Sequence, residues 1–577
     1  MNSQQIEQFL QDNLLKVNKP IQYLGNELNV IKKDWQLAKT KLCFVYPDKY
    51  EIGMSNMALQ IFYKLINVET DHLLERAFIP DTDMIDLLKA ENIPLFAVES
   101  KTPLRGFDAV AISFSTELSY TNALLAIDLA DIPLKSADRI GDENLPILFA
   151  GGGAVINPLP MSMFIDFFVI GDGEIVIEQI CDVLHKCKND LSLTKKETLE
   201  KISKFEHVYV PIFHDKETII EKATFKEVND PKYIVKKPLV PLLKVVHNRF
   251  SVELMRGCPR ICRFCQASYI NKPVRLRKKD VLLDQARNVM ATTGYEEISL
   301  SSLSSSDYPK VLDLLNDLDA ECVKQQVKLS LPSLRVDSMS ADVSEMTNKI
   351  RQSGVTLAPE AGSQFIRDVI LKNISEEEIL NTVRTASMNS KKGIKLYFMI
   401  GLPREEQEDL QAIVDLAFKI IRHIKPARNK IVINFSNFIP KAFTPFQWAK
   451  QDDRALIDEK LKFFKKELRH KQMEMRWTDA ELSVLEGILS RGDEKVGDLI
   501  YAAYKNGAIF DAWYDHFNFD NWAKAAKECS FDIDKYLCER QLEQSLPWGF
   551  IATGVKVDAM KKEYTAAYSV MRPPKSI

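Results

Sequence analysis

Short apolar segments alternate with helical stretches along the first third of the chain, and this alternation constrains the fold more than any other feature. Strands are expected at 41–47 (KLCFVYP), 108–115 (DAVAISFS), 146–151 (PILFAG) and 166–171 (DFFVIG). A loop containing Gly, Ser or Asp follows each of them. Buried strands that alternate with helices indicate an open parallel α/β sheet, in which ligands bind at the loops that follow the strands.

A second strand–helix series begins in RFSVELMRGC (249–258). Further strands are expected at 297–303 (EISLSSL), 328–334 (KLSLPSL), 355–361 (VTLAPEA), 394–401 (IKLYFMIG) and 431–438 (IVINFSNF). Helical segments fit between them, so the pattern predicts a partial (β/α)6 barrel of the TIM type. The remaining chain is mainly helical. Its aromatic-rich segment 507–522 is expected to form a core between the C-terminal helices and the barrel.

The length of 577 residues implies several domains. We expect an N-terminal leader at 1–34, an α/β domain at 35–195, connecting strands at 196–245, the barrel at 246–455 and a helical region at 456–577.

Composition and charge exclude some classes of protein. The chain is 46% hydrophobic with a formal net charge of −3, so no global basic field marks a nucleic-acid binder. No apolar run approaches the roughly 18 residues that a membrane span needs, and the polar N-terminus is not typical of a signal peptide. Cysteines outside one cluster are scattered. We therefore expect a cytoplasmic protein that makes no membrane contact.

That cluster is MRGCPRICRFCQ (255–266), which carries Cys258, Cys262 and Cys265. A structural zinc site usually has four ligands, and no fourth Cys or His lies close by in the sequence. Three thiolates can instead hold three irons of a 4Fe–4S cluster and leave the fourth iron open to a ligand. From the cysteines alone, both interpretations stand.

The wider context resembles the radical S-adenosylmethionine (SAM) enzymes. The Cys-x3-Cys-x2-Cys loop has an aromatic residue, Phe264, before its last cysteine and follows the first strand of the barrel series. The segments 358–370 (APEAGSQFIRDVI), 397–410 (YFMIGLPREEQEDL) and 438–448 (FIPKAFTPFQW) are similar to later strand ends of that superfamily. This resemblance implies a 4Fe–4S cluster on the three cysteines and SAM on the open iron.

The first domain narrows the resemblance to proteins that fuse a B12-binding-type, Rossmann-like domain to a radical SAM domain. The segments YPDKYEIGMSN, FSTELSYTNALLAIDLADIPL, AGGGAVINPLPM and FVIGDGE carry it. The cobalamin motif of such domains is Asp-x-His-x-x-Gly. Here Asp48 and Gly53 are present, but the histidine position holds Tyr50, a poor cobalt ligand beside imidazole. Cobalamin is thus either bound without a protein ligand or absent.

The resemblance implies further cofactor-binding residues at the strand ends. The SAM set is Phe264, Ser304, Asp307, Glu360, Arg367 and Gly401, and the set for possible cobalamin is Asp48, Tyr50, Gly53, Ser113, Ser115, Gly151 and Gly152. Structural alternatives remain for several of them. The serines would then cap a helix, the glycines would form a tight turn, and Glu360 would pair with Arg335 or Arg367.

The resulting hypothesis is an enzyme that reductively cleaves SAM to make a 5′-deoxyadenosyl radical, and that methylates its substrate if cobalamin binds. The alternatives are a cobalamin-independent enzyme that modifies RNA or protein, and a non-catalytic metal-binding scaffold or sensor. The basic stretches 271–280 and 465–477 are candidate RNA contacts. An electron donor such as flavodoxin or ferredoxin is an expected partner. The substrate, a small molecule, RNA or protein, does not follow from the sequence.

Overall fold

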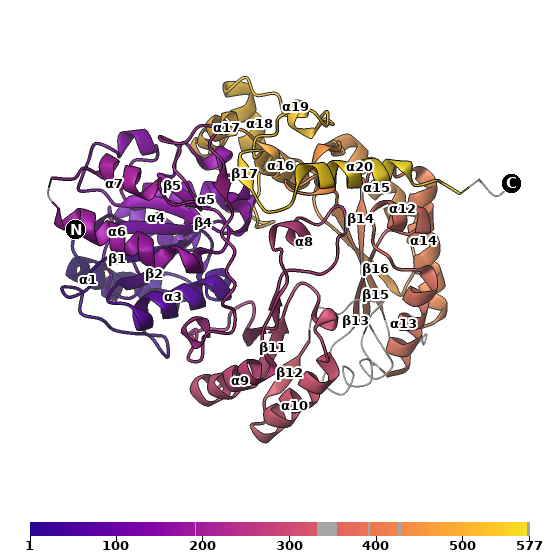
Figure 1. The fold of residues 1–577 in the computed structure, drawn as a ribbon, viewed down its shortest axis with the longest axis horizontal. Helices are drawn as coiled ribbons and strands as arrows, with labels where there is room; N and C mark the ends of the chain where they lie inside the picture. The colour runs from indigo at the N-terminus through magenta and orange to yellow at the C-terminus, as the bar shows by residue number, and fades with distance from the viewer. Residues whose placement is uncertain (191, 332–354, 390–392, 425–429, 574–577) are drawn as a thin grey trace.

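The computed structural model describes residues 1–190, 192–331, 355–389, 393–424 and 430–573. Figure 1 shows the first domain on the left, the second strand–helix series from the bottom centre to the right, and the C-terminal helices along the top. One hydrophobic core contains buried residues from all three parts, for example Ile112, Phe365 and Trp522. Shared burial of this kind joins the parts into one packed body.

A six-stranded sheet forms the first domain, with the strand order β2-β1-β3-β4-β5-β6. The pairs from β2 to β5 are parallel, and β6 is antiparallel to β5. The strands are β1 (Lys41–Tyr46), β2 (Leu73–Phe78), β3 (Ala109–Ser113), β4 (Ile147–Gly151), β5 (Phe167–Val169) and β6 (Val208–Tyr209). This confirms the predicted open α/β sheet.

Helices cover the first sheet and connect its strands. They are α1 (Ser3–Asn13), α2 (Tyr50–Gly53), α3 (Met57–Glu69), α4 (Thr82–Ala90), α5 (Tyr120–Leu129), α6 (Ile177–Asn189) and α7 (Lys195–Ile202). Strand β2 was not predicted, because Glu75 and Arg76 interrupt its apolar pattern. Arg76 is fully buried, where its guanidinium pairs with Glu27 and Glu99. Paired in this way, a charge can sit inside a strand.

The second series forms two parallel sheets, ordered β12-β11-β8 and β13-β14-β15-β16. Their strands are β8 (Phe250–Glu253), β11 (Glu297–Ser301), β12 (Lys328–Ser330), β13 (Val355–Glu360), β14 (Ile394–Ile400), β15 (Ile431–Asn437) and β16 (Met473–Trp477). Within the described ranges the two sheets are not joined into a closed barrel. The prediction of a partial barrel agrees with this arrangement.

The sheet β13-β14-β15-β16 runs past residue 455, where the barrel was expected to end. Its last strand, β16, pairs with β15 in parallel but was not predicted, because Glu474 and Arg476 interrupt the apolar residues of its sequence, MEMRW. The helices of this part are α8 (Gln266–Ile270), α9 (Lys279–Thr293), α10 (Val311–Lys324), α12 (Gln364–Val369), α13 (Glu376–Asn389), α14 (Gln407–Arg422) and α15 (Arg454–Glu467).

The C-terminal region is mainly helical, as predicted. It contains α16 (Ala480–Arg491), α17 (Lys495–Lys505), α18 (Phe519–Glu528), α19 (Asp534–Leu537) and α20 (Val557–Ser569). A short strand, β17 (Ile551–Ala552), pairs with β7 (Ile220–Glu221) of the connecting segment. In the described part of the chain, no helix is both long and apolar enough to cross a membrane.

Candidate functional site

The three clustered cysteines lie in the loop of a small hairpin. Strand β9 (Met255–Arg256) precedes the loop, and β10 (Arg275–Leu276) follows it, antiparallel to β9. Cys258 and Cys262 are buried, while Cys265 is half-buried at the start of α8. Gly257 has φ +90°, and a Cβ there would lie 2.6 Å from the Asn271 carbonyl oxygen. Only glycine allows the two ends of the loop to approach this closely.

Hydrogen bonds hold the loop against the later barrel strands. The backbone N–H of Arg263 donates to the Ile370 carbonyl at 3.0 Å, and its Nη1 donates to the Val369 carbonyl at 2.8 Å. Gln266 donates to the Ala442 carbonyl at 3.1 Å. These acceptors follow β13 and β15, so the cysteine loop lies over the ends of several strands.

The donor set of this loop suits an iron–sulfur cluster. Its three thiols lie within one short, anchored loop, and no disulfide joins them. In the part of the chain that the structure describes, no three His, Cys, Asp or Glu side chains converge on a single ion. A 4Fe–4S cluster does not require such convergence, because each cysteine binds a different iron. The residues present therefore fit the cluster.

One of the predicted SAM residues, Asp307, contacts the cysteine loop, and a second, Ser304, supports it. Asp307, in the turn after β11, forms a two-pronged ion pair with Arg260, with distances of 2.9 and 2.6 Å. Ser304 donates its hydroxyl to the same carboxylate at 2.7 Å. Arg260 lies between Cys258 and Cys262, so this turn and the loop are bound to each other. The two-pronged geometry fixes orientation as well as distance.

The other predicted SAM residues have separate surroundings. Glu360, at φ +66°, pairs with Lys372 at 3.0 Å, whereas its expected partner Arg335 lies outside the described residues. Arg367 is buried and donates to the carbonyls of Ala361, Gly362 and Ile374, which is a structural role. Phe264 packs partly buried against the shared core. Gly401 lines a different cavity, beside Glu405 and Lys460.

A cavity of about 500 Å³ lies between the first domain and the cysteine hairpin. On one side it is lined by the ends of β3, β4 and β5, including Ser113, Gly151 and Gly152. On the other side lie 255–257, directly before Cys258, and 301–303 at the end of β11. Much of its lining is apolar. The apolar wall is formed by Leu42, Phe44, Ala111, Phe149, Val169, Met57, Ile61 and Phe62, and charged groups also line the cavity, namely Asp172, Glu174, Lys222, Glu253 and Arg256. The carboxyl ends of strands from the first sheet and of β11, in the sheet β12-β11-β8, thus meet at one cavity.

A shared cobalamin site would need Asp48, Tyr50 and Gly53 in the same cavity as Ser113, Gly151 and Gly152, and the structure places them elsewhere. Tyr50 is 2% exposed, and its hydroxyl donates to Glu27 at 2.9 Å. A Cβ on Gly53 would lie 2.3 Å from the Phe78 ring, so Gly53 serves packing in the core. None of the three lines the cavity. Contacts within the chain, with Phe78, Glu27 and Trp513, account for these residues without a ligand.

Asp48 is covered by the chain's own C-terminal region. It accepts a hydrogen bond from Trp513 Nε1 at 2.8 Å, and burial raises the pKa of its carboxyl. The Lys49 ammonium lies 4.5 Å from the centre of the Trp513 ring, a cation–π contact. Segment 507–522 was expected to pack on the barrel. Its residues Phe510 and Trp513 instead contact the first domain.

Ser115 also lies outside the cavity lining, and its hydroxyl is 3.5 Å from the Asn56 amide. The basic stretch 271–280 is only partly exposed, since Lys278 is exposed but the two arginines are not. Arg275 and Arg277 are buried and pair with Asp172 and Glu253, respectively. Buried, paired arginines are poorly placed to contact an RNA backbone.

Two family models match the chain, one over most of the first domain and one over most of the second strand–helix series. Residues 58–211 match the model for the N-terminal region of radical SAM proteins, and residues 252–417 match the model for the radical SAM superfamily. The chain belongs to the radical SAM superfamily. As a radical SAM enzyme it uses a 4Fe–4S cluster and SAM, and the three cysteines are the residues that fit the cluster.

Named relatives cover different parts of this radical SAM enzyme. The uncharacterized protein MJ0966 of Methanocaldococcus jannaschii is 28% identical over 460 residues, covering 79% of this chain and 89% of that protein. The tRNA-2-methylthio-N(6)-dimethylallyladenosine synthase of Carboxydothermus hydrogenoformans is 26% identical over 191 residues, covering 31% of this chain and 43% of the synthase. Among solved structures, the apo form of the cobalamin-dependent SAM radical enzyme OxsB aligns with 92% of this chain and 83% of its own, at 11% identity and a TM-score of 0.44.

Sequence reasoning missed the residues that bind the radical SAM loop to its surroundings. Arg260, Arg256 and Asp172 were not singled out, although each forms ion pairs at or beside the loop. Arg260 and Arg256 lie within a few residues of a cysteine, which was the available signal. Most of their partners, Asp307, Asp172 and Glu174, are distant in the sequence, so no local pattern could reveal these pairs; Glu253, three residues before Arg256, is the exception.

Proposed function

We propose that this radical SAM enzyme binds cobalamin in the cavity between its first domain and its cysteine hairpin, and that it transfers a methyl group to its substrate. One observation carries the proposal. A single cavity is lined both by the strand ends of the first sheet and by the residue before Cys258. The strand order 2-1-3-4-5 is one in which ligands bind outside the carboxyl ends of the strands.

The chemistry belongs to the cofactors, since SAM at a reduced cluster supplies a 5′-deoxyadenosyl radical and cobalamin supplies a methyl carrier. The chain's own contribution is to bind, to orient and to exclude water. The apolar wall of the cavity suits a large ring system, and Ser113 offers a hydroxyl at its edge. Burial of the ligand between the two parts would keep bulk water from a reactive radical.

The glycines at the end of β4 support this fit. A Cβ on Gly151 would meet only the Val169 carbonyl oxygen, at 3.9 Å, and one on Gly153 only the Ser115 carbonyl oxygen, at 3.8 Å. The missing side chains therefore leave backbone open to the cavity. Tyr50 does not serve as a cobalt ligand in this proposal, because its hydroxyl donates to Glu27 and the residue does not line the cavity. The cofactor would bind with its own base displaced and with no protein nitrogen below the metal.

The proposal is tested by filling the cavity. Gly151→Leu adds an isobutyl group on the cavity side with little strain, because no atom lies close to its Cβ. The purified protein is incubated with hydroxocobalamin, freed of unbound cofactor by gel filtration, and analysed by absorption spectroscopy. We expect the wild type to retain cobalamin with a base-off spectrum and Gly151→Leu to retain at least tenfold less.

Gly141→Leu is the matched control, because a Cβ there has no atom within 4 Å and the residue does not line the cavity. It should retain cobalamin like the wild type. Failure of the wild type to retain cobalamin, or equal retention by Gly151→Leu, would contradict the proposal. So would a spectrum typical of a nitrogen ligand.

A second candidate is a cobalamin-independent enzyme that modifies RNA. It is favoured by the similarity of about a third of the chain to a tRNA methylthiolation enzyme. In that case the wild type would cleave SAM but retain no cobalamin. For either candidate we propose a cytoplasmic location and a flavodoxin or ferredoxin as electron donor, because reduced cysteines and a reduced cluster need such surroundings.

A further inference from the structure

The strand pair β9–β10, which we call the neck of the cysteine hairpin, places two arginines opposite each other. Arg256 of β9 and Arg275 of β10 are direct cross-strand partners, and the loop between them carries all three cysteines. Both side chains are largely buried, with 14% and 6% of their surface exposed. Like charges directly opposite in an antiparallel pair repel each other, and burial strengthens the repulsion. This neck therefore needs negative charge from elsewhere.

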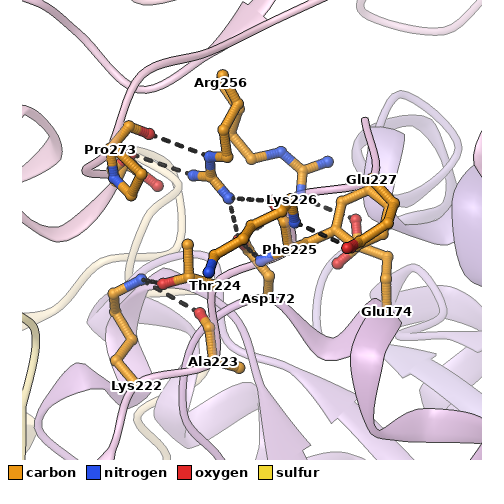
Figure 2. Close-up of polar contacts among 12 residues, drawn as sticks. Asp172, Glu174, Lys222, Ala223, Thr224, Phe225, Lys226, Glu227, Arg256 and Pro273 are labelled. Atoms are coloured by element: carbon orange, nitrogen blue, oxygen red, sulfur yellow. Dashed lines mark hydrogen bonds and ion pairs between the residues drawn. The ribbon is translucent and has the colours of Figure 1, made fainter. Parts of the chain in front are cut away.

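Asp172 of the first domain supplies that charge to both arginines. Its Oδ1 lies 3.2 Å from Arg256 Nη1, and its Oδ2 lies 2.5 Å from Arg275 Nη1. The same carboxylate accepts the backbone N–H of Phe225 at 2.9 Å, which fixes its position. Figure 2 shows Asp172 and Glu174 beside Arg256, next to the segment 222–227.

Other groups around the neck complete a network of ion pairs. Glu174 pairs with Arg256 at 2.8 Å, and Glu253 pairs with both Arg256 and Arg277. Burial opposes the charge of Glu253, but the two arginines lower the pKa of its carboxyl to about 2. Three carboxylates thus face three guanidinium groups. Of the carboxylates, only Asp172 and Glu174 come from the first domain, and only Asp172 bridges the two arginines at the neck.

Arg275 extends the network into the loop itself. It donates to the carbonyls of Asn271 and Pro273, which lie just before β10. The Asn271 carbonyl is also the atom that closely approaches Gly257, the neighbour of Cys258. A change at Asp172 therefore reaches the first cysteine through Arg275 and Asn271.

We propose that Asp172 is a positioning residue for the cysteine loop, through which the first domain fixes the geometry of the cluster site. The effect depends on its negative charge between Arg256 and Arg275. The proposal does not require cobalamin and holds whichever ligand fills the cavity.

The test compares Asp172→Asn with Asp172→Glu in the full chain. Asparagine has a similar shape but leaves the two arginines without their shared charge, while glutamate keeps it. In the protein without cluster, we expect peptides covering 257–274 to exchange amide hydrogen roughly tenfold faster or more in Asp172→Asn, because breaking a buried ion pair opens its neighbourhood. Asp172→Glu should stay close to the wild type.

Two controls separate positioning from general instability. Peptides covering 394–400 of β14 should exchange at the wild-type rate in both variants. Asp108→Asn removes a carboxylate that pairs with Lys188 beside the start of β3, and it should leave 257–274 unchanged. Wild-type exchange of 257–274 in Asp172→Asn would overturn the proposal. Equal effects of Asn and Glu would also overturn it, since they would show that charge is not the cause.

A second readout uses the reconstituted cluster. Loss of a negative charge near the cluster favours the more negative, reduced cluster, so its reduction potential should rise in Asp172→Asn. The potential should remain unchanged in Asp172→Glu. A potential that is identical in all three proteins would contradict the proposed position of Asp172 beside the cluster loop.

Discussion

The carboxyl edge of the first sheet has two halves, which differ in whether their residues are accessible to a ligand. In the first half, after β1, the side chains are buried in contacts within the chain. These residues are Asp48, Tyr50 and Gly53, and Trp513 of the C-terminal region donates a hydrogen bond to Asp48. We call this the closed half and the other the open half. After β3, β4 and β5, Ser113, Gly151 and Gly152 line a cavity that faces the cysteine hairpin. Both halves carry residues of the kind that bind ligands in such sheets. The second half borders a cavity of about 500 Å³, whereas the cavity beside Tyr50 measures only about 20 Å³.

The difference shows that a residue at a strand end is not necessarily accessible to a ligand. On the closed half, Asn122 accepts the backbone N–H of Phe510 at 2.6 Å and donates to the Pro47 carbonyl at 3.0 Å. The chain's own C-terminal segment thereby takes the hydrogen bonds that a ligand would need. On the open half, glycines leave the backbone accessible, so a ligand can still compete for it.

The largest expected effect concerns the loop that faces the open half. Replacing Cys258, Cys262 and Cys265 together with Ala should abolish the cluster and all SAM cleavage. The fold should survive, because the loop is a small part of the buried core. Iron and sulfide analysis, 5′-deoxyadenosine formation and circular dichroism measure the three results. A triple variant that still forms 5′-deoxyadenosine would break the assignment of this loop.

A buried carboxyl group on the closed half should make the free energy of unfolding depend on pH, by up to about 3 kcal/mol. Asp511 accepts hydrogen bonds from Thr121 and Trp522, and burial raises the pKa of its carboxyl to about 6. Between about pH 4 and 6 the folded protein keeps a proton that the unfolded chain has released. The contribution of Asp511 to the free energy of unfolding therefore falls as the pH rises from about 4 to 6.

Asp511→Asn is neutral at every pH and should lack this dependence. Relative to the wild type, its free energy of unfolding in urea should increase from pH 4 to 6 and level off above pH 6. The exposed Asp515→Asn, in the same segment, serves as the control. A constant difference between Asp511→Asn and the wild type across this range would mean that Asp511 does not hold a proton in the fold.

The smallest effect is expected at Tyr50. Tyr50→Phe removes one buried hydrogen bond to Glu27, which retains Arg76 as a partner, so the cost should be about 1 kcal/mol. Urea unfolding measures it. The spectrum of any bound cobalamin should not change, because Tyr50 lies on the closed half. A changed cobalt spectrum in this variant would place Tyr50 at the cofactor and would contradict the division of the sheet edge into a closed and an open half.

Much of the fold could be read from the sequence, because apolar strands and their loops have local signatures. The cysteine loop was also visible, since its three ligands lie within nine residues. Strands β2 and β16 were missed because charged residues interrupt them, and Arg76 is tolerated only through its distant partners Glu27 and Glu99. The closing of the β1 end by Trp513 and the ion pairs of Asp172 depend on contacts hundreds or tens of residues apart. No local pattern encodes such contacts.

The most direct test of the account asks whether a ligand in the open half lies beside the cluster. The protein is reconstituted anaerobically with iron, sulfide and cobalamin, reduced to the cob(II)alamin and 4Fe–4S(1+) states, and studied by electron paramagnetic resonance. The account predicts a spin–spin interaction between cobalt and cluster in the wild type, and its loss together with cobalamin in Gly151→Leu. Cobalt and cluster signals that are both present but independent of each other, or a wild type that binds no cobalamin, would contradict it.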